Sequence, residues 1–172
     1  MEKQKVQLNA TVGFLIKEGR ILLAMKTEKI GIGCWNGYGG DIEKTDKSIK
    51  YATIRELKEE TKEVVALAKD LEKIAIANVH NTKTDGRTFV CKVHFYIVKD
   101  WTGEAKETDT MIKPTWFDIY DLPYEKMMPA DRYWLHDALS GKKMIVDVKY
   151  GPFQKKLLEE PKIKYVKSFD EE

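Results

Sequence analysis

Three glutamates lie within the six residues Arg55-Glu56-Leu57-Lys58-Glu59-Glu60. In an α-helix, with about 3.6 residues per turn, Glu56 lies beside both Glu59 and Glu60. Like charges at this spacing destabilise an isolated helix by about 0.2–0.5 kcal/mol per pair. The segment is therefore typical either of a solvated acidic face or of a site for a hard divalent cation such as Mg2+ or Mn2+.

A helix is predicted around these glutamates, between Asp46 and Lys62. Its apolar residues, among them Ala52 and Leu57, fall on one face, and Asp46 or Ser48 can cap its first turn. A glycine-rich stretch from Gly31 to Gly40 precedes it. Such a backbone can adopt positive φ or lie close against a ligand. A glycine-rich loop leading into an acidic helix favours the cation site over the solvated face.

Apolar-rich or alternating segments predict strands on both sides of this unit. Tight turns are predicted at Glu18-Gly19 and at Asp85-Gly86. The predicted strands are Leu8 to Lys17, Arg20 to Lys26, Leu71 to His80, Thr88 to Val98 and Pro114 to Asp118.

The second half of the chain predicts one more helix, from Asp131 to Ser140, between Pro129 and Gly141. The tail from Lys142 onward is expected to add one or two strands before the acidic residues 170–172. Strands mixed with two helices predict an α/β layered domain.

Composition limits the classes of protein to consider. A chain of 172 residues with 42% apolar residues predicts one domain over residues 1–172. A net charge of +2 argues against a surface that tracks a nucleic-acid polymer. Apolar runs are too short to span a membrane, so a cytoplasmic protein is expected. Cys34 and Cys91, far apart and without zinc-ligand spacing, are expected to be free thiols.

The order of glycine-rich loop and acidic helix resembles the Nudix box. That pattern runs glycine, five residues, glutamate, seven residues, then Arg-Glu-aliphatic-any-Glu-Glu-any-Gly-aliphatic. Gly40 opens it here, and residues 55–60 match its core. The segment between Gly40 and Arg55 is one residue longer than the pattern, Asp46 or Lys47 replaces the first glutamate, and Lys62 replaces the late glycine.

The wider sequence, over roughly residues 8 to 150, is similar to the MutT-related enzymes of animal type that hydrolyse oxidised purine nucleoside triphosphates. The matching segments are Met25-Lys26, the loop Gly31 to Gly40, Pro114-x-Trp116-Phe117 and Pro129-x-Asp131-x-Tyr133-Trp134. This resemblance implies a Nudix fold, an α/β/α sandwich around a mixed sheet. It also implies hydrolysis of a nucleotide such as 8-oxo-dGTP to the monophosphate and pyrophosphate, as a monomer or homodimer.

The resemblance implies roles at the phosphate end of the site. Glu56, Glu59, Glu60 and the Gly39 carbonyl would hold Mg2+ or Mn2+, and Arg55 would orient a carboxylate. Glu56, Glu59 and Arg55 are thus the expected catalytic residues. The general base is either a helix glutamate or an acidic residue of a later loop. The loop position aligns with Thr110, and Glu107 and Asp109 lie nearby.

The resemblance also implies a base pocket. Asn36 would hydrogen-bond the base, Asp131 would read its edge, and Thr11 and Lys26 would line the pocket. Gly40 and Met128 are further expected contacts.

Three positions of this pocket depart from the relatives. Ile30 stands for a phenylalanine, Met128 for a stacking tryptophan, and Ala130 for the first of two adjacent aspartates. Asp131 therefore lacks the neighbour with which it could share a proton. Trp116 and Trp134 are expected to pack in the core.

Two alternatives stay open at this stage. One is a Nudix hydrolase for another nucleoside diphosphate derivative, indicated by Ile30, Met128 and Ala130. The other is a catalytically silent domain that binds a nucleotide, indicated by the irregular box and Lys62. RNA decapping is disfavoured because the sequence shows no basic stripe.

Overall fold

A mixed sheet forms the centre of the computed structural model, which describes residues 6–169. The strands are β1 (Val6–Lys17), β2 (Arg20–Lys26), β3 (Trp35–Asn36), β4 (Tyr38–Asp41), β5 (Leu71–Thr82), β6 (Thr88–Val98), β7 (Met111–Asp118), β8 (Lys143–Lys149) and β9 (Lys162–Val166). The helices are α1 (Ile49–Thr61) and α2 (Asp131–Leu139), with single 3-10 turns η1 (Ala68–Asp70), η2 (Tyr124–Lys126) and η3 (Pro152–Gln154).

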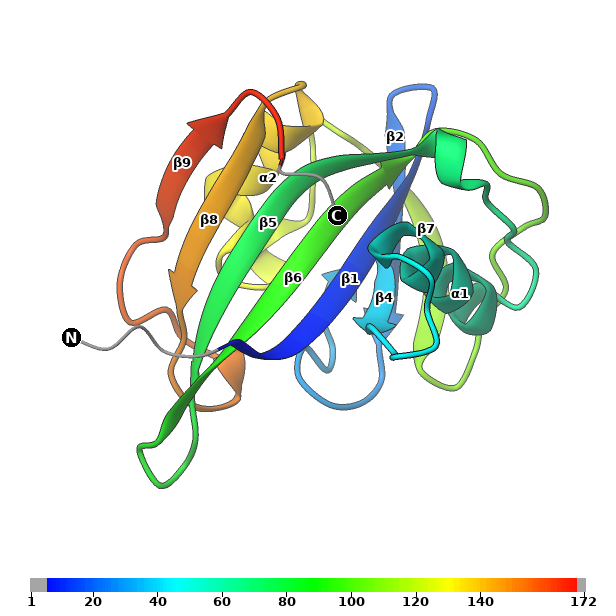
Figure 1. The fold of residues 1–172 in the computed structure, drawn as a ribbon. Helices are drawn as coiled ribbons and strands as arrows, with labels where there is room; N and C mark the ends of the chain where they lie inside the picture. Colours follow the sequence, from blue (N-terminus) through cyan, green and yellow to red (C-terminus); the bar gives the residue numbers. More distant parts are fainter. Residues whose placement is uncertain (1–5, 170–172) are drawn as a thin grey trace.

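The sheet runs in the order β3-β2-β1-β6-β5-β8-β9, and β4 and β7 pair with β1 and β2. The pairs β1–β6 and β5–β8 are parallel, and the other strand pairs are antiparallel. Figure 1 shows α1 on one face of the sheet and α2 on the other. The predicted α/β/α sandwich with a mixed sheet is therefore confirmed.

Each helix covers its own apolar cluster. Leu57 of α1 packs with Leu15 and Tyr96 on one face of the sheet. Trp134 and Leu135 of α2 pack on the other face, in a larger cluster with strand residues of β1, β2, β5 and β8. This division explains why successive residues of β1 and β2 are buried, since side chains alternate between the two faces of a strand and each face has its own cluster.

The predicted local structure is largely confirmed. Glu18 (φ 53°) and Gly19 (φ 74°) form the turn between β1 and β2, and Ser48 rather than Asp46 caps α1 by accepting a hydrogen bond from the Tyr51 amide at 3.3 Å. The strand predicted from Pro114 begins three residues earlier, at Met111. The tail adds both β8 and β9, while residues 170–172 lie outside the described part of the chain.

Two tryptophans expected in the core behave differently. Trp134 is buried and packs against Phe95 with ring centroids 4.6 Å apart. Trp116 is 41% exposed and stacks on Trp101, so the prediction for Trp116 is wrong. Within residues 6–169, its strand, β7, pairs with β2 alone and forms a margin of the sheet.

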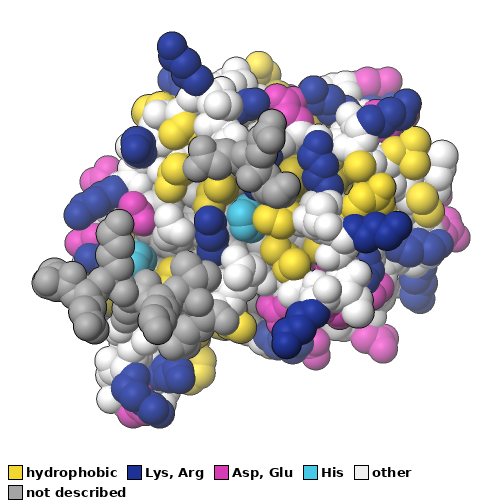
Figure 2. All heavy atoms as spheres, viewed as in Figure 1, with side chains coloured by type: hydrophobic (Ala, Val, Ile, Leu, Met, Phe, Trp, Pro, Cys, Tyr) yellow, Lys and Arg dark blue, Asp and Glu magenta, His cyan; other side chains and the backbone are white. Residues whose placement is uncertain are grey.

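Figure 2 shows Lys and Arg side chains interspersed with Asp and Glu on the face in view, without one continuous basic stripe. Among the described residues, no helix is long and apolar enough to cross a membrane. Cys34 and Cys91 are free thiols.

Candidate active site

The glycines before α1 bring backbone against the acidic face of the helix. A Cβ on Gly39 would lie 1.9 Å from the Thr11 carbonyl oxygen of β1, and a Cβ on Gly40 would lie 2.5 Å from Glu56 Oε1. The Gly39 amide donates a hydrogen bond to Glu60 Oε2 at 3.0 Å. Only glycine permits this approach, which places the β4 backbone beside two of the three helix carboxylates.

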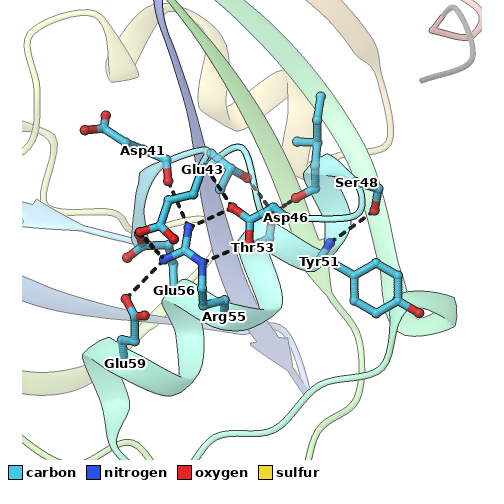
Figure 3. A network of polar contacts seen from close by, with 11 residues as sticks. Asp41, Glu43, Asp46, Ser48, Tyr51, Thr53, Arg55, Glu56 and Glu59 are labelled. Atoms are coloured by element: carbon cyan, nitrogen blue, oxygen red, sulfur yellow. Dashed lines mark hydrogen bonds and ion pairs between the residues drawn. The ribbon is translucent and has the colours of Figure 1, made fainter.

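Arg55 organises the carboxylates around it (Figure 3). Its Nε and Nη2 donate to the two oxygens of Asp46, each at 2.9 Å, in a bidentate pair. Its Nη1 donates to Glu56 Oε1 at 3.0 Å and to Glu59 Oε2 at 3.2 Å. Glu56 and Glu59 therefore converge on one point, and Asp46, not Lys47, takes the place of the first glutamate of the box.

Burial and mutual repulsion raise the pKa values of two helix carboxyls. The pKa of Glu60 is raised to about 7, mainly by burial and also by Glu56 and Glu59, while the Gly39 amide and Lys26 oppose the shift. Burial also raises the pKa of Glu56, against the opposing effect of Arg55. The Asp46 hydrogen bonds keep Arg55 protonated by raising its pKa. Partly buried carboxyls with raised pKa values are stabilised as carboxylates when a cation lies between them.

The donor set fits a hard divalent cation in its chemistry. Within residues 6–169, no three His, Cys, Asp or Glu side chains stand in the arrangement of a ready metal cage. Glu56 and Glu59 are engaged by Arg55, and Glu60 by the Gly39 amide. The oxygens needed by Mg2+ are nevertheless gathered on one helix face beside a glycine backbone.

A second cluster lies next to this one, around Gly31. Lys26 Cδ, Asn36 Nδ2 and Met128 Sδ each lie 3.3 Å from the position that a Gly31 Cβ would occupy. Lys26 links the clusters, because Glu60 is the main opposing influence on the burial that lowers the Lys26 pKa.

Asp131, at the start of α2, belongs to the second cluster. Burial raises the Asp131 pKa to about 7, opposed by the Met128 amide and the Trp134 side chain. The Asp131 amide also donates to the Met128 carbonyl at 3.0 Å. Cys34 lies close enough for Asp131 to raise its pKa, beyond the larger effect of burial. The cysteine is thus a member of this cluster that sequence reasoning had set aside as incidental.

Thr11 is placed differently from the other predicted substrate contacts. It is completely buried, its hydroxyl bonds the Thr53 hydroxyl of α1, and it donates to the His94 carbonyl at 3.2 Å. Thr11 thus ties β1 to α1 and β6. Lys26, Asn36 and Met128 contact the Gly31 position, whereas Thr11 pairs with Gly40 across β1 and β4.

The loop of residues 107–110, a predicted source of the general base, is hydrogen-bonded to the residue that follows β2. Thr27 donates through its hydroxyl to the Asp109 carbonyl and through its amide to the Thr110 carbonyl. Glu107 Oε1 accepts from the Lys113 amide at 2.7 Å. The loop is therefore hydrogen-bonded to Thr27, the residue after Lys26. The Glu107 carboxylate already accepts a hydrogen bond from the backbone of β7.

The Tyr38 hydroxyl, missed by sequence reasoning, is buried near the acidic helix. Glu60 contributes to raising the Tyr38 pKa, after burial. The hydroxyl makes no hydrogen bond within the described residues. The residue belongs to the glycine-rich stretch, whose pattern gave no sign of a buried hydroxyl beside the carboxylates.

Comparison with known proteins agrees with this geometry. The NUDIX domain family matches residues 7–138, and the chain belongs to this family. It is 34% identical over 137 residues to the oxidized purine nucleoside triphosphate hydrolase of Danio rerio, covering 78% of this chain and 81% of that protein. The protein of the same name from Mus musculus is 29% identical over 140 residues, covering 81% and 85%.

Solved structures show the same fold. The mutator MutT protein from Bacillus halodurans superposes with a TM-score of 0.73 at 20% identity, covering 91% of this chain and 97% of that one. The E. coli ORF135 protein superposes with a TM-score of 0.60 at 24% identity, covering 77% and 88%.

Proposed function

We propose that this chain hydrolyses a purine nucleoside triphosphate, with an oxidised purine such as 8-oxo-dGTP preferred, to the nucleoside monophosphate and pyrophosphate. The observation that carries the proposal is the pair of adjoining clusters. Carboxylates on α1 adjoin the Gly39–Gly40 backbone, and Lys26 leads from there to Asn36, Met128 and Asp131. The names of the two animal relatives support the substrate class.

At the phosphate end, Glu56, Glu59 and Glu60 would hold Mg2+ or Mn2+, together with the Gly39 carbonyl. The bound ion would supply charge neutralisation for the phosphates and acidify the attacking water. Lys26, whose charge faces Glu60, would bind a phosphate oxygen. Arg55, held by Asp46, would keep Glu56 and Glu59 oriented.

Glu59 is the proposed general base, because its side chain is 56% exposed and stands at the open end of the carboxylate cluster. Asp109 is the competing candidate, since Thr27 fixes its backbone beside β2. We expect Glu59→Gln to lower kcat by about 100-fold or more, while Asp109→Asn lowers it by less than about threefold. The reverse order of the two losses would make Asp109 the base.

At the base end, the Asn36 amide can both donate and accept a hydrogen bond. Asp131 lacks an adjacent carboxylate, yet burial, against two opposing hydrogen bonds, raises its pKa to about 7. Both protonation forms are then present near neutral pH, so Asp131 can donate to or accept from a base edge. This supports recognition of an oxidised purine without the second aspartate that the relatives carry.

A panel of nucleotides, assayed for pyrophosphate and phosphate release with and without EDTA, tests the proposal. The panel includes 8-oxo-dGTP, dGTP, dATP, a sugar nucleotide and a dinucleoside polyphosphate. We expect pyrophosphate release from oxidised purine triphosphates, lost with EDTA and in Glu60→Gln but retained in Glu63→Gln, an exposed glutamate just beyond α1. Equal turnover of oxidised and normal purines would refute the substrate preference.

A second candidate is hydrolysis of another nucleoside diphosphate derivative. Ala130 favours it, because this buried methyl group stands where the relatives carry a carboxylate. The sugar nucleotide and the dinucleoside polyphosphate in the same panel separate the two candidates.

A further inference from the structure

A cavity of about 420 Å³ opens beside the β5–β6 hairpin and Ile30 of the glycine-rich region. It is lined by Ile30, by the tip of the β5–β6 hairpin from Asn81 to Phe89, and by residues 152–154 of η3. These segments are far apart in sequence, and Figure 1 shows the hairpin tip, the loop after β8 and the loop before β3 at one edge of the molecule.

This cavity adjoins the second cluster of the candidate site. Ile30 directly precedes Gly31, around which Lys26, Asn36 and Met128 converge. Lys26 in turn faces Glu60. The order Glu60, Lys26, Gly31, Ile30 therefore leads from the carboxylates to the cavity, which follows the order of phosphate, sugar and base in a nucleotide.

The backbone of η3 is strained where it borders the cavity. Phe153 (φ 60°) and Gln154 (φ 54°) are consecutive non-glycine residues in the left-handed region. Such residues persist only when their surroundings hold them, and they cluster at ligand sites. Gln154 donates through its side chain to Asn81, and Thr82 donates to the Tyr150 carbonyl at 2.9 Å. The hairpin thus holds η3 in this conformation.

The strain leaves the Phe153 ring at the surface. Phe153 is 64% exposed, although an aromatic side chain of this size is usually more buried. Lys155 Nζ lies 5.9 Å from the ring centroid. The ring is therefore presented at the rim of the cavity rather than used in the core.

The cations of the rim are already engaged by protein groups. Lys83 Nζ lies 5.6 Å from the Phe89 ring centroid, and Arg87 pairs with Asp85 at 2.7 Å. With these charges taken up, the exposed faces of Ile30 and Phe153 are better suited to a planar, largely apolar group than to a phosphate.

We propose that Phe153 stacks on the purine base of the nucleotide. It would supply the aromatic surface that Ile30 and Met128 do not provide, so it is a substrate-binding residue at the base end of the site. This inference rests on the proposed function of the same site. Base stacking is tolerant of base identity but needs a ring, so the contribution belongs to the nucleotide's base and not to its phosphates.

Steady-state kinetics of Phe153 variants test this inference. We expect Phe153→Ala to raise KM for purine nucleoside triphosphates about tenfold, with kcat within about twofold of wild type, and Phe153→Trp to retain a low KM. Inorganic triphosphate has no base, so we expect its KM to be the same in the wild type and in every Phe153 variant. Leu158→Ala is the matched control, since Leu158 is 63% exposed on the same segment but lies outside the cavity lining.

Phe153→Gly separates stacking from a structural role. Glycine adopts the left-handed backbone without strain, so we expect a melting temperature at or above that of wild type together with the raised KM. Unchanged KM in both Phe153→Ala and Phe153→Gly, in an enzyme that hydrolyses purine triphosphates, overturns the inference and leaves the proposed function intact.

Calorimetric titration with a purine nucleoside monophosphate tests stacking on Phe153 separately from the proposed hydrolase activity. If the wild type hydrolyses no nucleotide, the proposed function fails, and this titration still decides the role of Phe153. Binding that weakens about tenfold in Phe153→Ala supports stacking. Equal affinity, or no binding by the wild type, overturns it.

Discussion

The Asp46 carboxylate accepts two hydrogen bonds from the Arg55 guanidinium, and only 6% of the Asp46 side chain is exposed. Asp46 also accepts from the Glu43 amide at 2.8 Å and donates its own amide to the Glu43 carbonyl at 3.0 Å, so residues 43–46 form a turn within the longer segment before α1. The insertion is thus absorbed before the helix begins, and Arg55 keeps its contacts with Glu56 and Glu59.

Replacing Asp46 should therefore impair catalysis through Arg55. We expect Asp46→Ala to lower kcat/KM by about 10- to 100-fold, as is usual for residues that orient a metal-binding carboxylate. Asp85→Ala is the matched control, because it removes an exposed carboxylate that pairs with Arg87 and lies away from the helix. Equal kcat/KM for the two variants would exclude a positioning role for Asp46.

Asp131 predicts a specific dependence of stability on pH. Its pKa is raised from 3.8 to about 7 by burial, near Cys34, Tyr124 and Tyr150. Between these two values the folded state keeps a proton that the unfolded state releases. The stability that Asp131 contributes is thus complete below pH 3.8 and is lost as the pH rises to about 7.

Asp131→Asn removes this titration. We expect the melting temperature of the variant, relative to wild type, to be higher at pH 8 than at pH 4 by about 3 °C or more. Scanning calorimetry at the two pH values measures the difference. An identical offset at both pH values would show that the Asp131 pKa is not raised in the folded protein.

The spacing of side chains along a helix could be predicted from the sequence, but their burial and contacts in the fold could not. The spacing of Glu56, Glu59 and Glu60 follows from helical geometry and was predictable, whereas the burial of Thr11 against Thr53 depends on where α1 packs on the sheet. The exposure of Trp116 likewise follows from the position of its strand and not from the local pattern.

At the scale of secondary-structure elements, β4 couples the sheet to the acidic helix through its backbone. Its Gly39 pairs with Val12 of β1 and donates its amide to Glu60. Any side chain at Gly39 would collide with the β1 backbone, so β4 would have to move away from β1, and Glu60 would lose its partner.

Gly39→Ala is accordingly expected to destabilise the protein by about 3 kcal/mol or more, since overpacking against backbone cannot be relieved by a rotamer change. Gly151→Ala serves as the control, because its Cβ would meet its nearest neighbour, Leu158, at an ordinary 3.5 Å. Chemical denaturation compares the two variants. A Gly39→Ala protein as stable as Gly151→Ala would contradict the close approach of β4 to β1.

The elements themselves were largely predictable because each carries a local signal. The turn at Glu18-Gly19, the alternation of β6 and the capped acidic helix all depend on neighbouring residues. The short strands β3 and β4 carry no such signal, since glycine-rich sequence indicates only an adaptable backbone.

Across the whole molecule, the parallel pairings β1–β6 and β5–β8 set the position of the site. They join segments separated by more than sixty residues, so periodicity within a segment could not predict them. The resemblance to Nudix enzymes supplied the architecture that the local patterns left open. The cavity at η3 was not predictable, because it depends on where the tail meets the β5–β6 hairpin.

We propose that α1 presents carboxylates to a divalent cation that holds the phosphates of a nucleotide. Electron paramagnetic resonance titration of Mn2+, with a non-hydrolysable nucleotide present, tests it directly in wild type and in the Glu56→Gln, Glu59→Gln, Glu60→Gln triple variant. We predict Mn2+ binding by the wild type and an affinity lower by about 100-fold or more in the triple variant. Absence of Mn2+ binding by the wild type, or equal affinity in the two proteins, would contradict the account.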